Sequence, residues 1–236
     1  MLTQDDAAQR AAYWLVPVFR AVPAAVLAIV ITFSADHSAH FGLLVFGVYG
    51  ITAGAVLAAL TWARLAGTTV RRYFLAQSGV TMICGIFSLV AVGGGVRYLF
   101  LIVTFFAAIT GLLELYSGIR TRRRFVASGD WRTAGILTLI VAVILLVLPP
   151  EYSQTFRGPD GVTRVLDSSV VVVGVMGAYA AVLAVYLLIA GFSAKWGTQL
   201  PSGGLSGPIL SGPISSGLTT TETSSNNSPS ESETSL

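Results

Sequence analysis

Apolar residues occur in six long stretches along the chain, separated by shorter segments that hold most of the polar and charged residues. The stretches cover approximately residues 13–33, 41–63, 73–91, 98–119, 134–148 and 169–192. A helix needs about 20 apolar residues to cross a hydrocarbon core of ~30 Å, and only the stretch 134–148 must borrow residues on either side. The pattern predicts an all-α integral membrane protein with six transmembrane helices within residues 13–196.

The composition supports a lipid environment. Hydrophobic residues make up 54% of the 236 residues and charged residues 11%, and the mean hydropathy is +0.76. An average soluble domain has about 25% charged residues, so this chain has too few to cover a water-soluble fold. The chain opens with Asp5 and Asp6, whereas basic residues precede the apolar core of a signal peptide. We therefore expect a short N-terminal segment, residues 1–12, and a first helix that is retained.

Basic residues are distributed unevenly between the two sides that six helices would create. One side would carry ten of them and the other three: Arg10, Arg64, Arg71, Arg72, Arg120, Arg122, Arg123, Arg124, Arg132 and Lys195, against Arg97, Arg157 and Arg164. Cytoplasmic loops hold an excess of Lys and Arg, so the distribution predicts that both termini are cytoplasmic in the inner (cell) membrane. Arginines placed between apolar stretches indicate topology and do not suggest nucleic-acid binding.

The residues from Gly197 to the end differ in composition from the rest of the chain. Gly, Ser, Thr, Pro and Asn dominate this segment. Such a composition cannot build a packed core, so residues 197–236 are predicted to be a disordered cytoplasmic tail. A tail of this kind could recruit a partner, and the chain would then act as a membrane anchor.

The six stretches also show an internal repetition. The second, fourth and sixth each contain a small residue, an apolar run and then a basic residue, as from Gly54 to Arg64. The first, third and fifth begin instead with aromatic or basic residues. This predicts three parallel helical hairpins, related by an axis along the membrane normal. Trp and Tyr prefer the headgroup level, and seven of them lie near expected helix ends: Trp14, Trp62, Tyr73, Tyr98, Trp131, Tyr152 and Trp196.

Two charged residues, Arg20 and Glu114, fall inside the apolar stretches. A charge near the middle of a membrane helix costs about 2.5–3.5 kcal/mol on insertion scales, so each needs a partner or access to water. With a rise of 1.5 Å per residue, both would lie about 9–11 Å below the cytoplasmic boundary. Equal depth predicts an ion pair between the first and fourth helices. The alternative is that Arg20 extends to the headgroups while Glu114 is protonated or bonded locally.

A proton relay through Glu114 would need several acidic or His residues across the membrane, and this chain offers one. The intramembrane polar residues that could line a transport path are few: Gln77, Ser78, Thr81, Ser88, Thr104, Thr110 and Thr138. Asp36, His37 and His40 lie between the first two helices, where His could bind Zn or respond to acid. A solvated turn is the simpler interpretation of that segment. The sequence contains no catalytic constellation and no cofactor motif, so we expect neither an enzyme nor a bound cofactor.

Small residues form two faces on the predicted helices. Gly50 and Gly54 make a GxxxG pattern in the second helix, and Gly174 and Gly177 lie in the sixth. Small residues let helix backbones approach closely in lipid, so these faces predict packing within the bundle or a homo-oligomer contact. The single cysteine, Cys84, is expected to pack in an apolar helix. The basic cluster Arg120, Arg122, Arg123 and Arg124 would set topology and could also attract anionic lipid headgroups.

Two segments of the chain resemble a known family. The pattern Gly111-Leu112-Leu113-Glu114-Leu115, followed by Ile119-Arg120, is similar to the signature of HdeD-like membrane proteins. The opening of the next hairpin resembles them as well: Trp131-Arg132, then Gly135-Ile136-Leu137, an apolar run and Pro149.

The resemblance implies a bacterial inner-membrane protein built from short two-helix repeats, without an enzymatic mechanism and linked to resistance to acid stress. Pro17, Arg20 and Pro23 in the first helix depart from the pattern. A small transporter or channel and a membrane anchor remain the alternatives.

Overall fold

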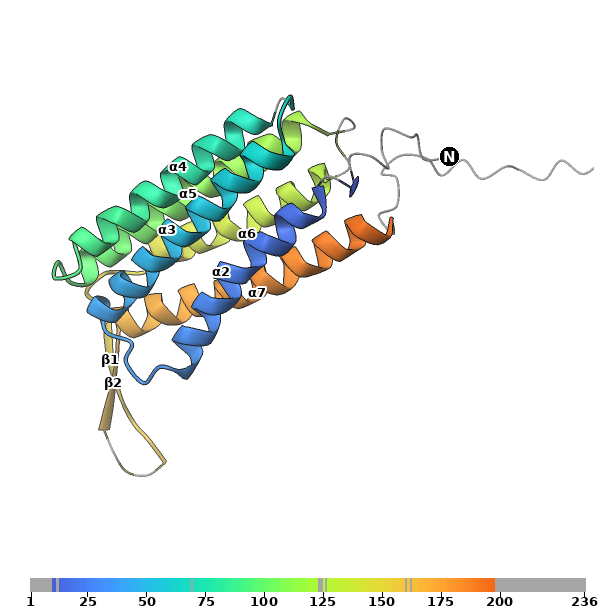
Figure 1. The fold of residues 1–236 in the computed structure, drawn as a ribbon. Helices are drawn as coiled ribbons and strands as arrows, with labels where there is room; N and C mark the ends of the chain where they lie inside the picture. The colour runs from blue at the N-terminus through green and yellow to red at the C-terminus, as the bar shows by residue number, and fades with distance from the viewer. Residues whose placement is uncertain are drawn as a thin grey trace, which may run out of the picture. The chain divides into compact units, whose positions relative to one another are not determined.

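The computed structural model describes residues 10–11, 13–68, 70–122, 125, 127–159, 161 and 163–197. The chain divides into two units, Met1–Ser202 and Gly203–Leu236, and the described residues all belong to the first. Six long helices form this unit (Figure 1): α2 (Leu15–Phe33), α3 (Ala39–Arg64), α4 (Arg71–Val90), α5 (Val96–Arg120), α6 (Ser128–Val147) and α7 (Ser168–Trp196). Each is long and apolar enough to cross a membrane. The prediction of an all-α, six-span fold is confirmed.

Helix ends differ from the predicted spans where polar residues continue the helix. The clearest case is α6, which begins at Ser128, six residues before the apolar stretch 134–148 starts. Its polar first turns supply the length that the apolar part lacks. At the other extreme, α7 ends at Trp196 because Gly197 takes the left-handed conformation with φ of 70°, and its N–H donates to the Ser193 carbonyl. Hydropathy therefore marks the part of each helix that suits lipid, whereas hydrogen bonding extends the helix into the polar boundary.

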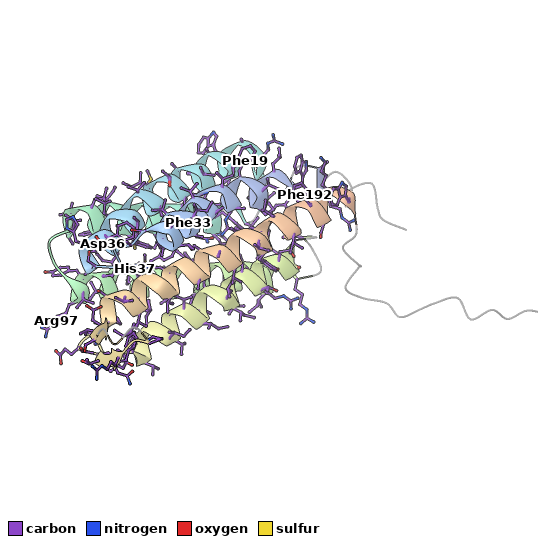
Figure 2. All side chains as sticks on the ribbon, turned by 90° about the horizontal axis from the view of Figure 1, so that it is seen from below. Phe19, Phe33, Asp36, His37, Arg97 and Phe192 are labelled. Carbon is purple, nitrogen blue, oxygen red and sulfur yellow. The ribbon has the colours of Figure 1, made fainter. Side chains whose placement is uncertain are left out.

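The helices run back and forth, so the bundle has two chemically different ends. One end, here called the arginine-rich end, holds the starts of α2, α4 and α6 and the ends of α3, α5 and α7, with Arg64, Arg71, Arg72, Arg120 and Arg122. The opposite end holds the segments 34–38 and 91–95 and a small β-hairpin, and is called the β-hairpin end. Figure 2 places Asp36, His37 and Arg97 at that end, while Phe192 lies toward the arginine-rich end.

Helix packing does not follow the predicted hairpins. The most extensive contacts join α3 with α4, α5 with α6, and α2 with α7, and Figure 1 shows α2 beside α7. The predicted hairpins would instead pair α2 with α3, α4 with α5, and α6 with α7. The three-repeat arrangement is therefore not confirmed by the packing, because the closest pairs are offset by one helix along the chain.

Glycines explain two of the close helix pairs. A Cβ atom on Gly50 would lie 2.7 Å from the Cα of Gly85, and one on Gly54 would lie 2.9 Å from the Ser78 carbonyl oxygen, so α3 touches α4 backbone to backbone. In the same way, a Cβ on Gly135 of α6 would lie 2.5 Å from the backbone nitrogen of Leu115 in α5. Such contacts need a residue without a side chain.

The two glycines predicted in α7 behave differently. Gly177 faces α2, where an added Cβ would lie 2.7 Å from a side-chain carbon of Ile31. Gly174 is exposed, and an added Cβ would meet no atom within 4 Å. The prediction of packing within the bundle is therefore wrong for Gly174. The two residues are three positions apart, but the helix rotation places Gly174 on the outer surface.

A two-stranded antiparallel sheet connects α6 to α7. Strand β1 (Ser153–Arg157) pairs with β2 (Thr163–Asp167), and Ser153 lies opposite Asp167. Figure 1 shows this hairpin extending from the end of the bundle. The sequence did not predict these strands, since two five-residue strands carry too weak an alternating pattern. Phe156 and Val165 are both exposed on them.

The outer surface of the bundle is apolar. Large hydrophobic side chains with more than three quarters of their surface exposed include Phe33, Leu146 and Val147, and Phe19 and Phe192 are also exposed (Figure 2). A soluble monomer rarely shows such a continuous apolar surface. In a bilayer these side chains contact lipid tails, so the protein is a multi-pass membrane protein surrounded by lipid.

Candidate functional site

A buried ion pair lies in the interior of the bundle. Nη1 of Arg20, from α2, donates to Oε1 of Glu114, from α5, at 2.7 Å. The Glu114 side chain is 2% exposed and that of Arg20 is 11% exposed, so neither charge reaches bulk water. The structure thus brings together the two residues whose equal depth predicted the pair. Arg20 does not extend to the headgroups, and Glu114 is not limited to local partners.

The pair lies between the arginine-rich end and the middle of the bundle. Arg20 is five residues from the start of α2, and Glu114 is six residues from the end of α5. At a rise of 1.5 Å per residue these positions are about 7.5 Å and 9 Å along their helices. The charges are thus within the helices and closer to the arginine-rich end than to the β-hairpin end.

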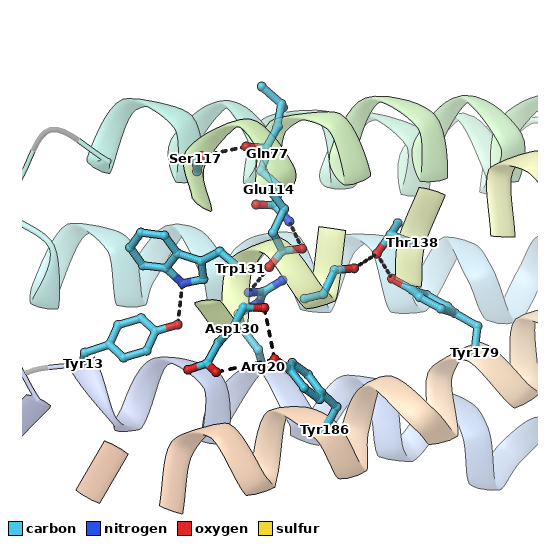
Figure 3. Close-up of polar contacts among 12 residues, drawn as sticks. Tyr13, Arg20, Gln77, Glu114, Ser117, Asp130, Trp131, Thr138, Tyr179 and Tyr186 are labelled. Carbon is cyan, nitrogen blue, oxygen red and sulfur yellow. Dashed lines mark hydrogen bonds and ion pairs between the residues drawn. The ribbon is translucent and has the colours of Figure 1, made fainter. Parts of the chain in front are cut away.

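Other side chains surround the pair (Figure 3). Nε2 of Gln77, from α4, donates to the second carboxylate oxygen of Glu114 at 3.4 Å. Phe74 lies in the same helix, and the centre of its ring is 6.0 Å from the Arg20 guanidinium carbon, at the outer limit of a cation–π contact. Residues of three helices, α2, α4 and α5, therefore meet at the ion pair, and Glu114 accepts hydrogen bonds on both carboxylate oxygens.

A small cavity of about 30 Å³ adjoins the ion pair. All six helices contribute to its lining: Arg20, Tyr49, Ala53, Gln77, Thr81, Phe106, Thr110, Glu114, Thr138, Tyr179, Leu183 and Leu187. A water molecule needs about 10–15 Å³ of such space, so the cavity could accommodate roughly two waters but no organic molecule. Gln77, Thr81, Thr110 and Thr138 were predicted as intramembrane polar residues, and here they meet at one point.

The hydroxyl groups of the cavity lining are satisfied mostly within their own helices. Thr81 donates to the Gln77 carbonyl and Thr110 to the Phe106 carbonyl, each four residues earlier. Thr138 bonds the Ala134 carbonyl at 2.9 Å and the Tyr179 hydroxyl at 2.8 Å, which links α6 to α7 (Figure 3). Such bonds remove the cost of burying a hydroxyl in an apolar interior. The threonines therefore form a polar centre without forming a continuous path.

An aromatic cluster closes the centre toward the arginine-rich end. Trp131 is 1% exposed and lies against Tyr13, Phe74 and Phe125, with ring centres 5.0–5.6 Å away. Its indole N–H donates to the Tyr13 hydroxyl (Figure 3). The sequence placed Trp131 among the boundary aromatics, but the structure buries it, because helix rotation turns the ring into the bundle. Water from this side would have to displace packed rings.

Buried aliphatic and aromatic side chains close the opposite side. The layer toward the β-hairpin end contains residues at most 2% exposed, namely Leu43, Phe46, Leu99, Val103, Val172 and Val173. Ser88 is also buried there, and its hydroxyl donates to the Leu43 carbonyl at 2.7 Å. The layer therefore offers no open polar route from the cavity toward this end among the described residues.

An apolar groove of about 360 Å³ lies between α2 and α3 on the lipid-facing surface. Its lining is almost entirely aliphatic: Val22, Pro23, Val26, Leu27, Val30, Leu44, Val45, Val48, Tyr49, Thr52 and Val56. The Thr52 hydroxyl is bonded to the carbonyls of Val48 and Tyr49. Tyr49 lines both this groove and the polar cavity, so it forms part of the wall between lipid and the charged centre.

No protein-family model, no curated protein and no solved structure matches this chain. The resemblance to HdeD-like proteins therefore rests on the quoted residues alone. Three of those residues have a structural role: Gly111 and Gly135 face each other across α5 and α6, and Glu114 belongs to the ion pair. The charged centre and the surfaces of the bundle are the features of this protein that bear on its function.

The predicted pH-sensing segment is a capped turn at the β-hairpin end. The Asp36 carboxylate accepts the backbone N–H of Ser38 at 2.8 Å, and this bond holds the Asp36 pKa below its usual value. Ser38 in turn caps α3 by accepting the N–H of Phe41, and the His37 carbonyl accepts the Ser169 hydroxyl. His40 belongs to the first turn of α3. No group of three His, Cys, Asp or Glu residues in the described part of the chain is arranged to hold a metal.

The remaining predicted sites are only partly described. Arg120 and Arg122 are exposed at the arginine-rich end, whereas Arg123 and Arg124 lie outside the described residues. The tail beyond Gly197 and most of residues 1–12 also lie outside them. Cys84 is buried in α4. Tyr49 and Tyr179 are the polar lining residues of the cavity that the sequence did not indicate, because a Tyr in an apolar helix shows nothing about the direction its ring faces.

Proposed function

We propose that this chain is a non-enzymatic bacterial inner-membrane protein of the HdeD-like type that contributes to acid or envelope stress tolerance. The observation that carries the proposal is the buried Arg20–Glu114 pair, enclosed by packed side chains at both ends of the bundle. Ionisable residues inside a membrane protein are costly, and those that are retained usually have a function. This one offers no reacting partner and no room for a substrate, which favours a structural or sensing role.

The ion pair connects helices that have little other contact. The extensively packed pairs are α3 with α4, α5 with α6 and α2 with α7, and α2 with α5 is not among the helix pairs in regular contact. Attraction between Arg20 and Glu114 therefore joins two halves of the bundle. Replacement of Glu114 by an uncharged side chain would remove that attraction and leave the guanidinium without a counter-charge. The other titratable side chains around the cavity are Tyr49 and Tyr179.

Acid survival of a deletion strain tests the proposal. The strain would be complemented with the full chain, with Glu114→Gln, and with Glu151→Gln as a control at an exposed carboxylate. We expect the full chain and the Glu151 variant to restore survival and the Glu114 variant to fail at matched membrane levels. Full rescue by Glu114→Gln would disprove a role for the ion pair, and unchanged survival without the gene would disprove the stress assignment.

A small transporter is the second candidate, and the position of Tyr49 is what favours it. Because Tyr49 lines both the lipid-facing groove and the polar cavity, movement of its ring would join the two. Proteoliposomes loaded with a pH-sensitive or ion-sensitive dye would report flux at acidic and neutral pH. The structural role predicts no flux above that of empty liposomes, whereas flux that Tyr49→Ala increases would support the transporter.

The proposed orientation places the arginine-rich end in the cytoplasm. Exposed Arg120 and Arg122 would attract anionic lipids there through their charge alone. A membrane-impermeant thiol reagent applied to intact spheroplasts should label Arg97→Cys at the β-hairpin end and not Arg122→Cys. The reverse labelling would invert the orientation. The tail beyond Gly197 would then lie on the cytoplasmic side, and complementation with a truncated chain that ends at Gly197 tests whether stress tolerance needs it.

A further inference from the structure

A second polar site lies away from the charged centre, at the arginine-rich end. A cavity of about 580 Å³ opens between the end of α3 and the start of α4, lined by Trp62, Thr68, Arg71, Arg72 and Leu75. We call it the Trp62–Arg72 pocket. It combines two guanidinium groups with an indole ring and an aliphatic wall, and it contains no acidic side chain.

Aromatic rings hold the two arginines in place. The guanidinium carbon of Arg71 lies 4.3 Å from the centre of the Trp62 ring. That of Arg72 lies 5.1 Å from the centre of the Tyr73 ring, and its Nη2 donates to the Tyr73 hydroxyl. Stacking of this kind is a cation–π contact, which leaves the planar edge of a guanidinium free to donate hydrogen bonds. Both groups are therefore oriented without using a carboxylate.

The positive charge of the pocket is not balanced by the described part of the protein. The two salt bridges found there involve Arg20 and Arg97, not Arg71 or Arg72. Nε of Arg71 is buried and has no hydrogen-bond partner. Two adjacent cations without a counter-charge favour an anion with several acceptor oxygens. Phosphate fits this best, because arginine binds it through paired hydrogen bonds.

The position of the pocket indicates what carries the phosphate. Trp62 lies in the last turn of α3 and is 68% exposed, at the level where an apolar helix meets a polar connection. Trp at such a level contacts the boundary between headgroups and tails. Leu75 extends the apolar wall one turn further into the membrane. The pocket is therefore continuous with the lipid-facing surface, polar at its rim and apolar below.

We propose that Trp62, Thr68, Arg71 and Arg72 form a binding site for the phosphate of an anionic phospholipid. The lipid phosphate receives hydrogen bonds from both guanidiniums, while the Thr68 hydroxyl, which donates to the Leu65 carbonyl at 2.7 Å, lines the rim, and an acyl chain follows Leu75 into the bilayer. The site differs from the diffuse attraction at Arg120 and Arg122, because it depends on the arrangement of the groups and not only on their charge.

Native mass spectrometry of the full chain, titrated with phosphatidylglycerol or with phosphatidylcholine of the same acyl chains, tests the site. We expect the anionic lipid to bind more tightly, and Arg71→Gln and Arg72→Gln each to weaken it about fivefold. The decisive variants preserve charge. Arg71→Lys and Trp62→Leu should each weaken binding about threefold, since both remove the stacked, planar geometry. Arg122→Gln measures the diffuse contribution and should have a smaller effect than Arg71→Gln.

Several results would overturn the proposal. Equal effects of Arg71→Gln and Arg122→Gln, together with unchanged binding in Arg71→Lys and Trp62→Leu, would show that only diffuse charge matters. Equal binding of the two lipids would exclude recognition of an anionic lipid. Displacement of phosphatidylglycerol by millimolar inorganic phosphate would identify a soluble phosphate as the ligand instead. Circular dichroism of each variant establishes that helix content is retained, and Arg71→Lys keeps the charge that orients the chain.

Discussion

Removal of one member of the Arg20–Glu114 pair should destabilise the bundle far more than removal of both. Glu114→Gln keeps the shape of the side chain but leaves the buried Arg20 guanidinium without a counter-charge, and Arg cannot be deprotonated in a protein. Breaking a buried pair in this way costs about 3–5 kcal/mol. Arg20→Met should cost less, because the remaining carboxyl can become neutral by binding a proton.

The double variant Arg20→Met/Glu114→Leu removes both charges and keeps apolar side chains in their place. Replacing a buried ion pair with apolar side chains of similar size is often neutral or stabilising. We therefore expect the double variant to lie within about 1 kcal/mol of the wild type, so that the single changes are strongly non-additive. The exposed pair of Arg97 and Glu151 supplies the control, since its side chains are 74% and 80% exposed. Arg97→Gln should cost less than about 1 kcal/mol.

Reversible unfolding in mixed micelles, driven by sodium dodecyl sulfate, measures these differences. Trp131 provides a local signal because it packs in the cluster that closes the charged centre, and circular dichroism reports helix content. If Glu114→Gln lowered the free energy of unfolding no more than Arg97→Gln does, the buried pair would contribute no more to stability than an exposed pair. If the double variant were as unstable as the sum of the single variants, the two residues would not be coupled. Either result would refute the reasoning.

Four further substitutions have expected outcomes in the same unfolding assay. Gly50→Ala should destabilise by about 1–3 kcal/mol because its Cβ would meet the α4 backbone, whereas Gly174→Ala meets no atom and should gain about 0.5–1 kcal/mol; equal effects would contradict the packing. Tyr13→Phe removes the acceptor of the buried Trp131 N–H and should cost about 1–3 kcal/mol, unless another acceptor replaces it. The Asp167 carboxylate accepts the Val170 N–H, which lowers the Asp167 pKa, so the cap contributes fully above about pH 4 and is lost as the pH falls through the lowered pKa. Asp167→Asn should remove that pH dependence, and an unchanged acid profile would show that the cap does not titrate.

The sequence-based predictions agree most closely with the structure for features that depend on the position of a residue along its helix. The six spans follow from the length of the apolar stretches, and the Arg20–Glu114 contact follows from two charges at equal depth in an otherwise apolar interior. Both inferences use only the rise per residue and the cost of a charge in lipid. The structure places the two charged groups 2.7 Å apart.

Contacts that depend on the rotation of a helix about its axis could not be predicted from the sequence. Tyr49 and Tyr179 face the polar cavity and Trp131 faces the aromatic cluster, while Gly174 faces outward. In a soluble helix, alternation of apolar and polar residues reveals the inner face. In lipid the outer face is as apolar as the inner one, so that signal is weak. Helix direction was predictable, but helix rotation was not.

The amino-acid sequence by itself determined that this is a six-span membrane protein with one pair of opposite charges in its apolar interior. Only the tertiary structure decided which helices pack together, and it paired α3 with α4, α5 with α6 and α2 with α7 in place of consecutive hairpins. It also placed Arg71 against Trp62 and left their pocket without a carboxylate. Position along the membrane normal is set by transfer of each residue between water and lipid, which is a local property. Choice of neighbour is set by close contact between distant residues, which a single sequence does not display.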